Sequence, residues 1–175
     1  VQQGAPPPFQ AHLRDGAIDS AGRFLPRAAL DSTLRIWDLQ TGEQIHCFQH
    51  PAPVAACVLT PDGDLGISVD GAGGVGIWDM KTGGRVDLVE SGPPFFHCAL
   101  KRQGALFAAA ERGGRIRLWD LRERRELRSF DGGPSVPTRC RFSSDGRSLL
   151  LASRDGRVRM WDLTGEATTR IVARH

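Results

Sequence analysis

The 175-residue sequence lacks the features that mark membrane and secreted proteins. It contains no apolar run near the roughly 18 residues that span a bilayer. Residues 1–9, VQQGAPPPF, have neither the basic start nor the apolar core of a secretory signal, and they lack an initiating methionine. Apolar residues make up 40% and charged residues 25%, as in ordinary soluble domains. We therefore expect a soluble, intracellular protein that is either processed or a fragment of a longer chain.

Paired cysteines are also lacking. The cysteines lie far apart and form no Cys-X-X-Cys motif, so the sequence predicts neither a zinc site nor a disulfide framework. They are Cys47, Cys57, Cys98 and Cys140. The last three stand six residues before a repeated turn glycine, which indicates a core position on a strand. A reducing compartment, the cytoplasm or the nucleus, fits this usage.

Motifs for catalysis are lacking as well. The sequence shows no nucleophile beside a base, no carboxylate pair and no cluster of metal ligands. The glycine-rich segment 70–76, DGAGGVG, lacks the lysine of a phosphate-binding loop and leads into a strand pattern, so a loose hairpin is expected there. The sequence therefore predicts a protein that is not an enzyme, with no catalytic residue, metal or cofactor.

Charge is distributed unevenly along the chain. Residues 1–100 hold 6 Lys+Arg against 11 Asp+Glu, a net charge of −5, whereas residues 101–175 hold 17 against 9, a net charge of +8. Such a basic half could bind nucleic acid or another polyanion, or its arginines could line solvated strand edges among interleaved acids. The arginines concerned are Arg115, Arg117, Arg122, Arg124, Arg125 and Arg128.

A repeat of about forty residues organises the whole sequence. The dipeptide Trp-Asp recurs in steps of 41, 41 and 42 residues, at Trp37-Asp38, Trp78-Asp79, Trp119-Asp120 and Trp161-Asp162. Apolar residues alternate through each preceding segment, as in LRIWDL, which predicts a strand with bulky side chains on both faces. Such sheets need cover on both faces, as stacked sheets provide for each other.

Turn signals occur at constant spacing within each repeat. A glycine stands 15 residues before each tryptophan, at Gly22, Gly63, Gly104 and Gly146. Two of them end Pro-Asp-Gly or Ser-Asp-Gly, where glycine supplies the positive φ of a tight hairpin. Thr-Gly pairs follow three of the tryptophans, at Thr41-Gly42, Thr82-Gly83 and Thr164-Gly165. Each repeat is therefore predicted to be four strands joined by turns.

These motifs resemble the WD40 repeat family, over roughly residues 10–175. The resemblance implies an all-β propeller of four-stranded antiparallel blades around a central channel, and a non-catalytic scaffold for protein–protein interaction. It places the repeats at about 10–49, 50–90, 91–132 and 133–175, after an N-terminal segment, 1–9, that is either separate or the end of a preceding strand.

The resemblance also implies a structural group in each blade, in which a His, a Ser or Thr, an Asp and the Trp are joined by hydrogen bonds. His50 stands at the position of the histidine, and Asp31 and Asp155 at that of the aspartate. At the position of the aspartate, the second repeat has Ala72 and the third has Gly113. We therefore expect no repeat to have the full set and the tryptophans to be held mainly by packing. Asp70 and Glu111, two residues earlier, are alternative acids.

Partner binding is expected on the loops of one propeller face. The positions that match the family's binding face are Pro51, Phe96, Arg112 and Arg154. Aromatic and arginine side chains are frequent anchors of interfaces. Two of these positions also have a structural alternative, because Phe96 could pack on Phe95 and Arg154 could pair with Asp155.

The number of blades decides whether the ring closes. The family usually closes with seven blades, and this sequence has four repeats. We expect part of a larger propeller, because an open ring would leave the apolar faces of its end blades exposed. A closed four-bladed ring is one alternative. Self-association of half-rings, with the acidic half of one chain against the basic half of another, is a second.

Overall fold

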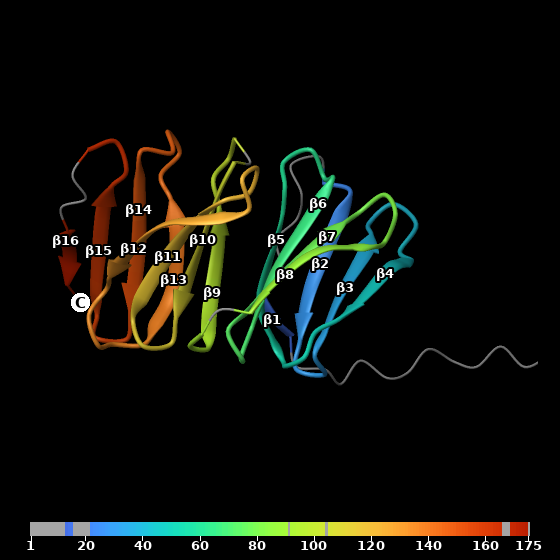
Figure 1. Ribbon diagram of the computed structural model, residues 1–175, viewed down its shortest axis with the longest axis horizontal. Helices are drawn as coiled ribbons and strands as arrows, with labels where there is room; N and C mark the ends of the chain where they lie inside the picture. Colours follow the sequence, from blue (N-terminus) through green and yellow to red (C-terminus); the bar gives the residue numbers. More distant parts are fainter. Residues whose placement is uncertain (1–12, 16–21, 91, 104, 166–168, 175) are drawn as a thin grey trace, which may run out of the picture.

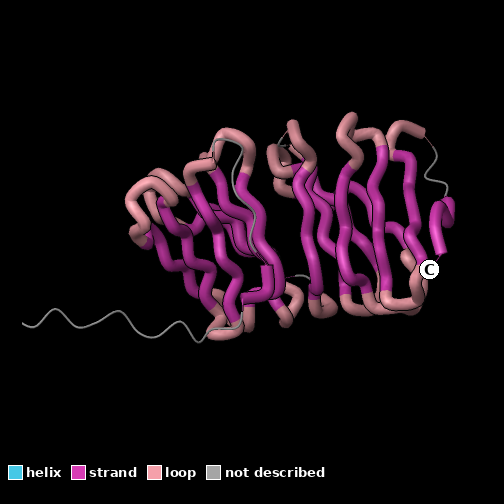
Figure 2. The backbone as a smooth tube through the Cα atoms, turned by 180° about the vertical axis from the view of Figure 1, so that it is seen from behind, coloured by secondary structure: helices cyan, strands magenta, loops and turns pink. Residues whose placement is uncertain are grey.

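The computed structural model describes residues 13–15, 22–90, 92–103, 105–165 and 169–174, and the regular structure in these segments is β-sheet (Figures 1 and 2). Sixteen strands form four antiparallel sheets of four strands each. The predicted all-β fold of four-stranded blades is confirmed. Residues 1–9 and Gly104, to which the sequence assigned roles, lie outside the described segments.

The strands of each sheet are consecutive in the chain. The first sheet contains β1 (Leu13–Asp15), β2 (Phe24–Ala29), β3 (Thr33–Asp38) and β4 (Gln44–Gln49). The second contains β5 (Val54–Leu59), β6 (Leu65–Asp70), β7 (Gly74–Asp79) and β8 (Arg85–Glu90). The third contains β9 (Phe95–Leu100), β10 (Leu106–Glu111), β11 (Arg115–Asp120) and β12 (Arg125–Asp131). The fourth contains β13 (Pro137–Phe142), β14 (Ser148–Ser153), β15 (Arg157–Asp162) and β16 (Thr169–Arg174).

Tight hairpins connect the strands, as the glycine pattern predicts. Gly63, in the β5–β6 turn, has φ +74°, and Gly146, in the β13–β14 turn, has φ +69°. A residue with a Cβ adopts this conformation only with strain, so the glycines fix where each hairpin turns.

The four sheets stack face to face in chain order, with the first and the fourth at opposite ends of the array (Figure 1). The leading strands β5, β9 and β13 lie side by side, and the last strand of each sheet lies at its outer margin. The ring is not closed. Each sheet falls within one of the predicted repeats, although the repeat boundaries themselves stay a prediction.

Three apolar clusters hold consecutive sheets together, one in each interface. The tryptophans of the last three sheets face the preceding sheet and are buried: Trp78 is 4% exposed, Trp119 6% and Trp161 1%. Trp37, on the first sheet, is half-buried. The leading-strand cysteines, Cys57, Cys98 and Cys140, are buried thiols that form no disulfide, which confirms their predicted core position.

Candidate functional site

The second sheet carries a buried hydrogen-bonded network that joins its strands. Trp78 Nε1 donates to Ser68 Oγ at 2.8 Å, and Ser68 Oγ lies 2.6 Å from His50 Nε2. His50 Nδ1 lies 3.1 Å from a carboxylate oxygen of Asp70. The other oxygen of Asp70 accepts the backbone N–H groups of Ala72 and Gly74 at 2.9 and 2.8 Å. The connection before β5, the β6–β7 turn and the tryptophan on β7 are thereby fastened together.

The hydrogen bonds and the burial of His50 together favour its neutral form. A carboxylate only accepts, so His50 Nδ1 carries the proton that bonds to Asp70. Ser68 Oγ accepts from Trp78, and beside a neutral ring it donates its own proton to His50 Nε2. Burial lowers the pKa of His50 below its ordinary value, and the hydrogen bond and charge of Asp70 offset only part of this effect.

The expectation that no repeat has the complete set of His, Ser, Asp and Trp is wrong for the second repeat. Asp70 supplies the carboxylate from the end of β6, two residues before the position that the family resemblance assigned. Spacing alone could not decide this point, because the turn conformation determines which acid reaches the imidazole.

The other sheets use an ion pair in place of this network. An arginine two residues before the tryptophan meets an acid at the β-turn of the same sheet. The pairs are Arg35–Asp31 at 2.7 Å, Arg117–Glu111 at 2.6 Å and Arg159–Asp155 at 2.7 Å. Arg159 holds the pKa of the Asp155 carboxyl below its usual range. Asp31 and Asp155 thus bind arginine, and Glu111 takes the same role in the third sheet.

The network of the second sheet and the ion pair of the fourth sheet each depend on a glycine at a different repeat position. In the second sheet the residue two before the tryptophan is Gly76, where a Cβ would lie 2.7 Å from the Trp78 ring. In the fourth sheet Gly133 stands where the second repeat has His50, and a Cβ there would lie 3.0 Å from the Arg159 guanidinium. The arginine therefore extends into the space that the histidine fills in the second sheet.

The four predicted binding residues lie toward one edge of the array. Arg112 N–H donates to Pro94 O at 2.7 Å, and Arg154 N–H donates to Val136 O at 2.9 Å, so each turn lies beside the connection that enters its sheet. The Gly71 N–H bonds to Pro53 O in the same way in the second sheet, near Pro51. Pro51, Arg112 and Arg154 are exposed, whereas Phe96 is half-buried on β9.

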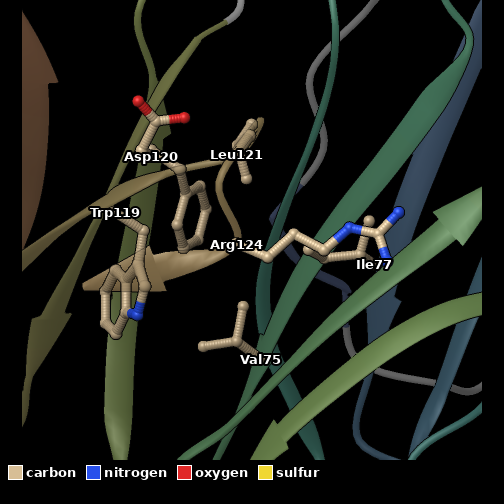
Figure 3. A pocket seen from close by; sticks show the side chains of 7 residues that line it. Val75, Ile77, Trp119, Asp120, Leu121 and Arg124 are labelled. Atoms are coloured by element: carbon tan, nitrogen blue, oxygen red, sulfur yellow. The ribbon is translucent and has the colours of Figure 1, made fainter. Parts of the chain in front are cut away.

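The opposite edge contains a groove that the sequence did not predict. It has a volume of about 690 Å³ and lies between the second and third sheets. Its lining includes the β5–β6 turn at Asp62, the β9–β10 turn at Arg102 and the β11–β12 turn at Arg122 and Arg124. A small apolar slot beside it is lined by residues that include Val75, Ile77, Trp119 and Leu121 (Figure 3).

Comparison with known proteins assigns one segment of the chain to a family. Residues 124–162 match the family described as WD domain, G-beta repeat. This segment is a WD40 repeat. No curated protein matches the chain.

The WD40 repeat is out of phase with the sheets. Its matched residues run from β12, the outer strand of the third sheet, through β13, β14 and β15 of the fourth. One repeat therefore contributes to two consecutive sheets and links them covalently.

The described residues hold no group of three or more His, Cys, Asp or Glu side chains placed to bind a metal. Among them there is also no helix of the length and apolarity that a membrane crossing requires.

The neutral state of His50 predicts a pH dependence of stability. Because its pKa is lowered on folding, the unfolded chain takes up a proton at pH values below about 6.5 that the folded protein does not. The contribution is fully present above that pH and is lost as the pH falls through the folded-state pKa. Urea denaturation between pH 7.5 and 5.5 should show wild type losing stability relative to His50→Gln. Parallel curves would contradict this assignment.

Gly76→Ala should destabilise the protein by about 1–3 kcal/mol, because the added methyl group overlaps the Trp78 ring. The matched control is Gly113→Ala, whose Cβ meets no atom within 4 Å. Denaturant midpoints of both variants measure the difference. Equal midpoints would show that the close contact with Trp78 does not restrict this position.

Proposed function

We propose that the chain is a non-catalytic protein-interaction scaffold of four WD40 repeats, over about residues 10–49, 50–90, 91–132 and 133–175. The observation that carries the proposal is the division between buried and exposed polar groups. The buried ionisable groups at the strand ends bond to each other and stabilise the sheets. The exposed loops of the same edge remain available to a partner. The four cysteines lie far apart in the sequence and form no disulfide, which supports an intracellular setting, in the cytoplasm or the nucleus.

Arg112 and Arg154 are the proposed anchors on this edge, with Pro51 and Phe96 beside the adjoining connections. Both arginines are exposed, and among the described residues neither guanidinium has a hydrogen bond or ion pair. Asp155 forms its ion pair with Arg159 and not with the neighbouring Arg154. Arginines that meet a partner at such a site commonly dominate binding.

Crosslinking and mass spectrometry of the tagged protein in cell extract test the scaffold. Crosslinks to partner proteins should cluster on the edge that carries Arg112 and Arg154, and the double variant Arg112→Ser/Arg154→Ser should lose about tenfold or more of the recovered partner. Arg85→Ser, at the first residue of the outer strand β8, serves as the exposed-arginine control. Equal recovery of the partner with the double variant and with Arg85→Ser would show that Arg112 and Arg154 are not part of the interface.

Polyanion binding by the arginine-rich second half is the alternative function. Several of its arginines already bind acids: Arg117 contacts Glu111 and Glu126, Arg125 contacts Glu123, and Arg159 contacts Asp155. Their charge is therefore largely neutralised within the sheets. Tight binding of labelled single-stranded DNA with a steep loss on added salt would favour this alternative over the scaffold.

We further propose that two copies associate through the open ends of the array. Residues of the fourth sheet on the face away from the third are half-buried, although they occupy repeat positions that are buried in the third sheet. They are Leu150, Ala152, Val158 and Met160, at the positions of Ala108, Ala110, Ile116 and Leu118. On the first sheet, Trp37 and Leu39 are more exposed than the equivalent Trp78 and Met80. The opposite net charges of the two halves support this pairing.

Light scattering during size exclusion tests the association. Wild type should elute with twice the monomer mass at low salt and move toward monomer mass at high salt, because attraction between the halves is screened. Val158→Asp should be monomeric at both salt concentrations, since it places a charge in the apolar contact. Leu30→Asp is the control, at an apolar residue already 38% exposed outside this face. A wild-type monomer at low salt would contradict the proposal.

A further inference from the structure

An aromatic contact that closes two of the inter-sheet interfaces is missing from the third. Phe48 of the first sheet stacks on Trp78 with ring centroids 4.7 Å apart, and Phe130 of the third sheet lies 5.6 Å from Trp161. The corresponding position of the second sheet is Val89, which pairs with Val75 as Phe48 pairs with Leu34. No phenylalanine of the second sheet is therefore available at this position to cover the tryptophan of the third.

Trp119 is nonetheless buried against the second sheet. Its ring also contacts two aromatic rings of its own sheet, with centroids 5.9 Å from that of Phe95 and 5.8 Å from that of Phe107. Beside this interface, turns of the second and third sheets line the groove of about 690 Å³. This volume falls within the range of roughly 300–1,000 Å³ that is typical of ligand sites.

The floor of the groove is apolar. Leu65, Ile77 and Val86 come from the second sheet, and Leu121 comes from the third. Figure 3 shows the neighbouring slot, in which the side chain of Arg124 points away from Trp119 and toward Ile77.

The rim of the groove carries guanidinium groups without partners. Arg102, Arg122 and Arg124 are exposed, and no guanidinium among them has a hydrogen bond or ion pair to a described residue. The lining also contains one aspartate, Asp62, which accepts from Thr60 Oγ1 and from the Asp64 N–H. Asp120, in the neighbouring slot, attracts the charge of Arg122. Because three arginines of the lining stand against one aspartate, the groove carries a net positive charge, which is complementary to carboxylates.

Arg124 is held in a conformation that arginine rarely adopts. Its φ is +52°, whereas the two preceding repeats have Gly42 at φ +73° and Gly83 at φ +69° in the same turn position. A non-glycine residue in the left-handed region is strained, and such strain is often associated with a functional site. This backbone conformation favours glycine. The presence of arginine at this position therefore indicates a role for its side chain in binding.

We propose that this groove binds an acidic peptide segment of a partner protein, with an apolar side chain inserted against Ile77 and Leu121 and flanking carboxylates on Arg102, Arg122 and Arg124. The proposal rests on the scaffold function and adds a second surface, at the edge opposite Arg112 and Arg154. The geometry favours a peptide over nucleic acid because the cationic rim surrounds an apolar floor, on which the described residues place no exposed aromatic ring for a base to stack.

Fluorescence anisotropy tests the proposal with a labelled synthetic peptide that has a central Leu-Phe-Leu segment between glutamate runs. Wild type should bind this peptide. A peptide with lysine in place of glutamate, and one with serine in place of the apolar centre, should each bind at least about tenfold more weakly. Equal binding of all three peptides, or no binding of the first, would overturn the proposal.

Variants of the full chain locate the site. Arg124→Gly removes the guanidinium and relieves the left-handed strain, so binding should fall about tenfold or more while the denaturation midpoint is maintained or raised. Ser32→Gly is the matched control, because Ser32 is also left-handed at φ +64° but lies in the β2–β3 turn, outside the groove lining. Unchanged binding in Arg124→Gly would overturn the site.

The outcomes separate this proposal from the scaffold function. Loss of crosslinked partners in Arg112→Ser/Arg154→Ser with no peptide binding would support the scaffold and overturn the groove. Single-stranded DNA that binds as tightly as the acidic peptide and competes with it would overturn the peptide as the occupant.

Discussion

The structure depends on the burial of sheet faces against neighbouring sheets. Each four-stranded sheet carries large apolar side chains on both faces, and burying such a side chain stabilises a protein by roughly 1.5–3 kcal/mol. A single sheet can satisfy neither face alone. The tryptophans of the last three sheets, turned toward the preceding sheet, are buried in this contact. The same requirement explains why apolar residues at the two ends of the open array are only half-buried.

The polar side chains at the strand ends are bonded in two different ways in this chain. The second sheet joins His50, Ser68, Asp70 and Trp78 through neutral and charged hydrogen bonds, and the other sheets use arginine with a carboxylate. Both satisfy buried or half-buried polar groups near the connecting turns. They differ in charge state, because the imidazole is neutral whereas guanidinium always carries its proton. These hydrogen bonds and ion pairs give the buried ionisable groups a structural role.

The repeats differ from one another at one position between the sheets. Where the neighbouring repeats place Phe48 and Phe130 over a tryptophan, the second repeat has Val89. Repeats that depart from their own pattern differ from their neighbours in surface shape while they keep the common core. Both edges of the array carry exposed arginines on their turns, and one of the edges also contains the groove.

The sequence by itself determined the class of fold, the four-stranded unit and the hairpin positions, because alternation and glycine spacing are local properties of the chain. It also identified the leading-strand cysteines as core residues. Only the tertiary structure decided which acid reaches His50, that arginine extends into the histidine position of the fourth sheet, and where consecutive sheets leave a groove. These features depend on distances between residues far apart in the chain, and repeat spacing does not specify how neighbouring side chains divide the space between two sheets.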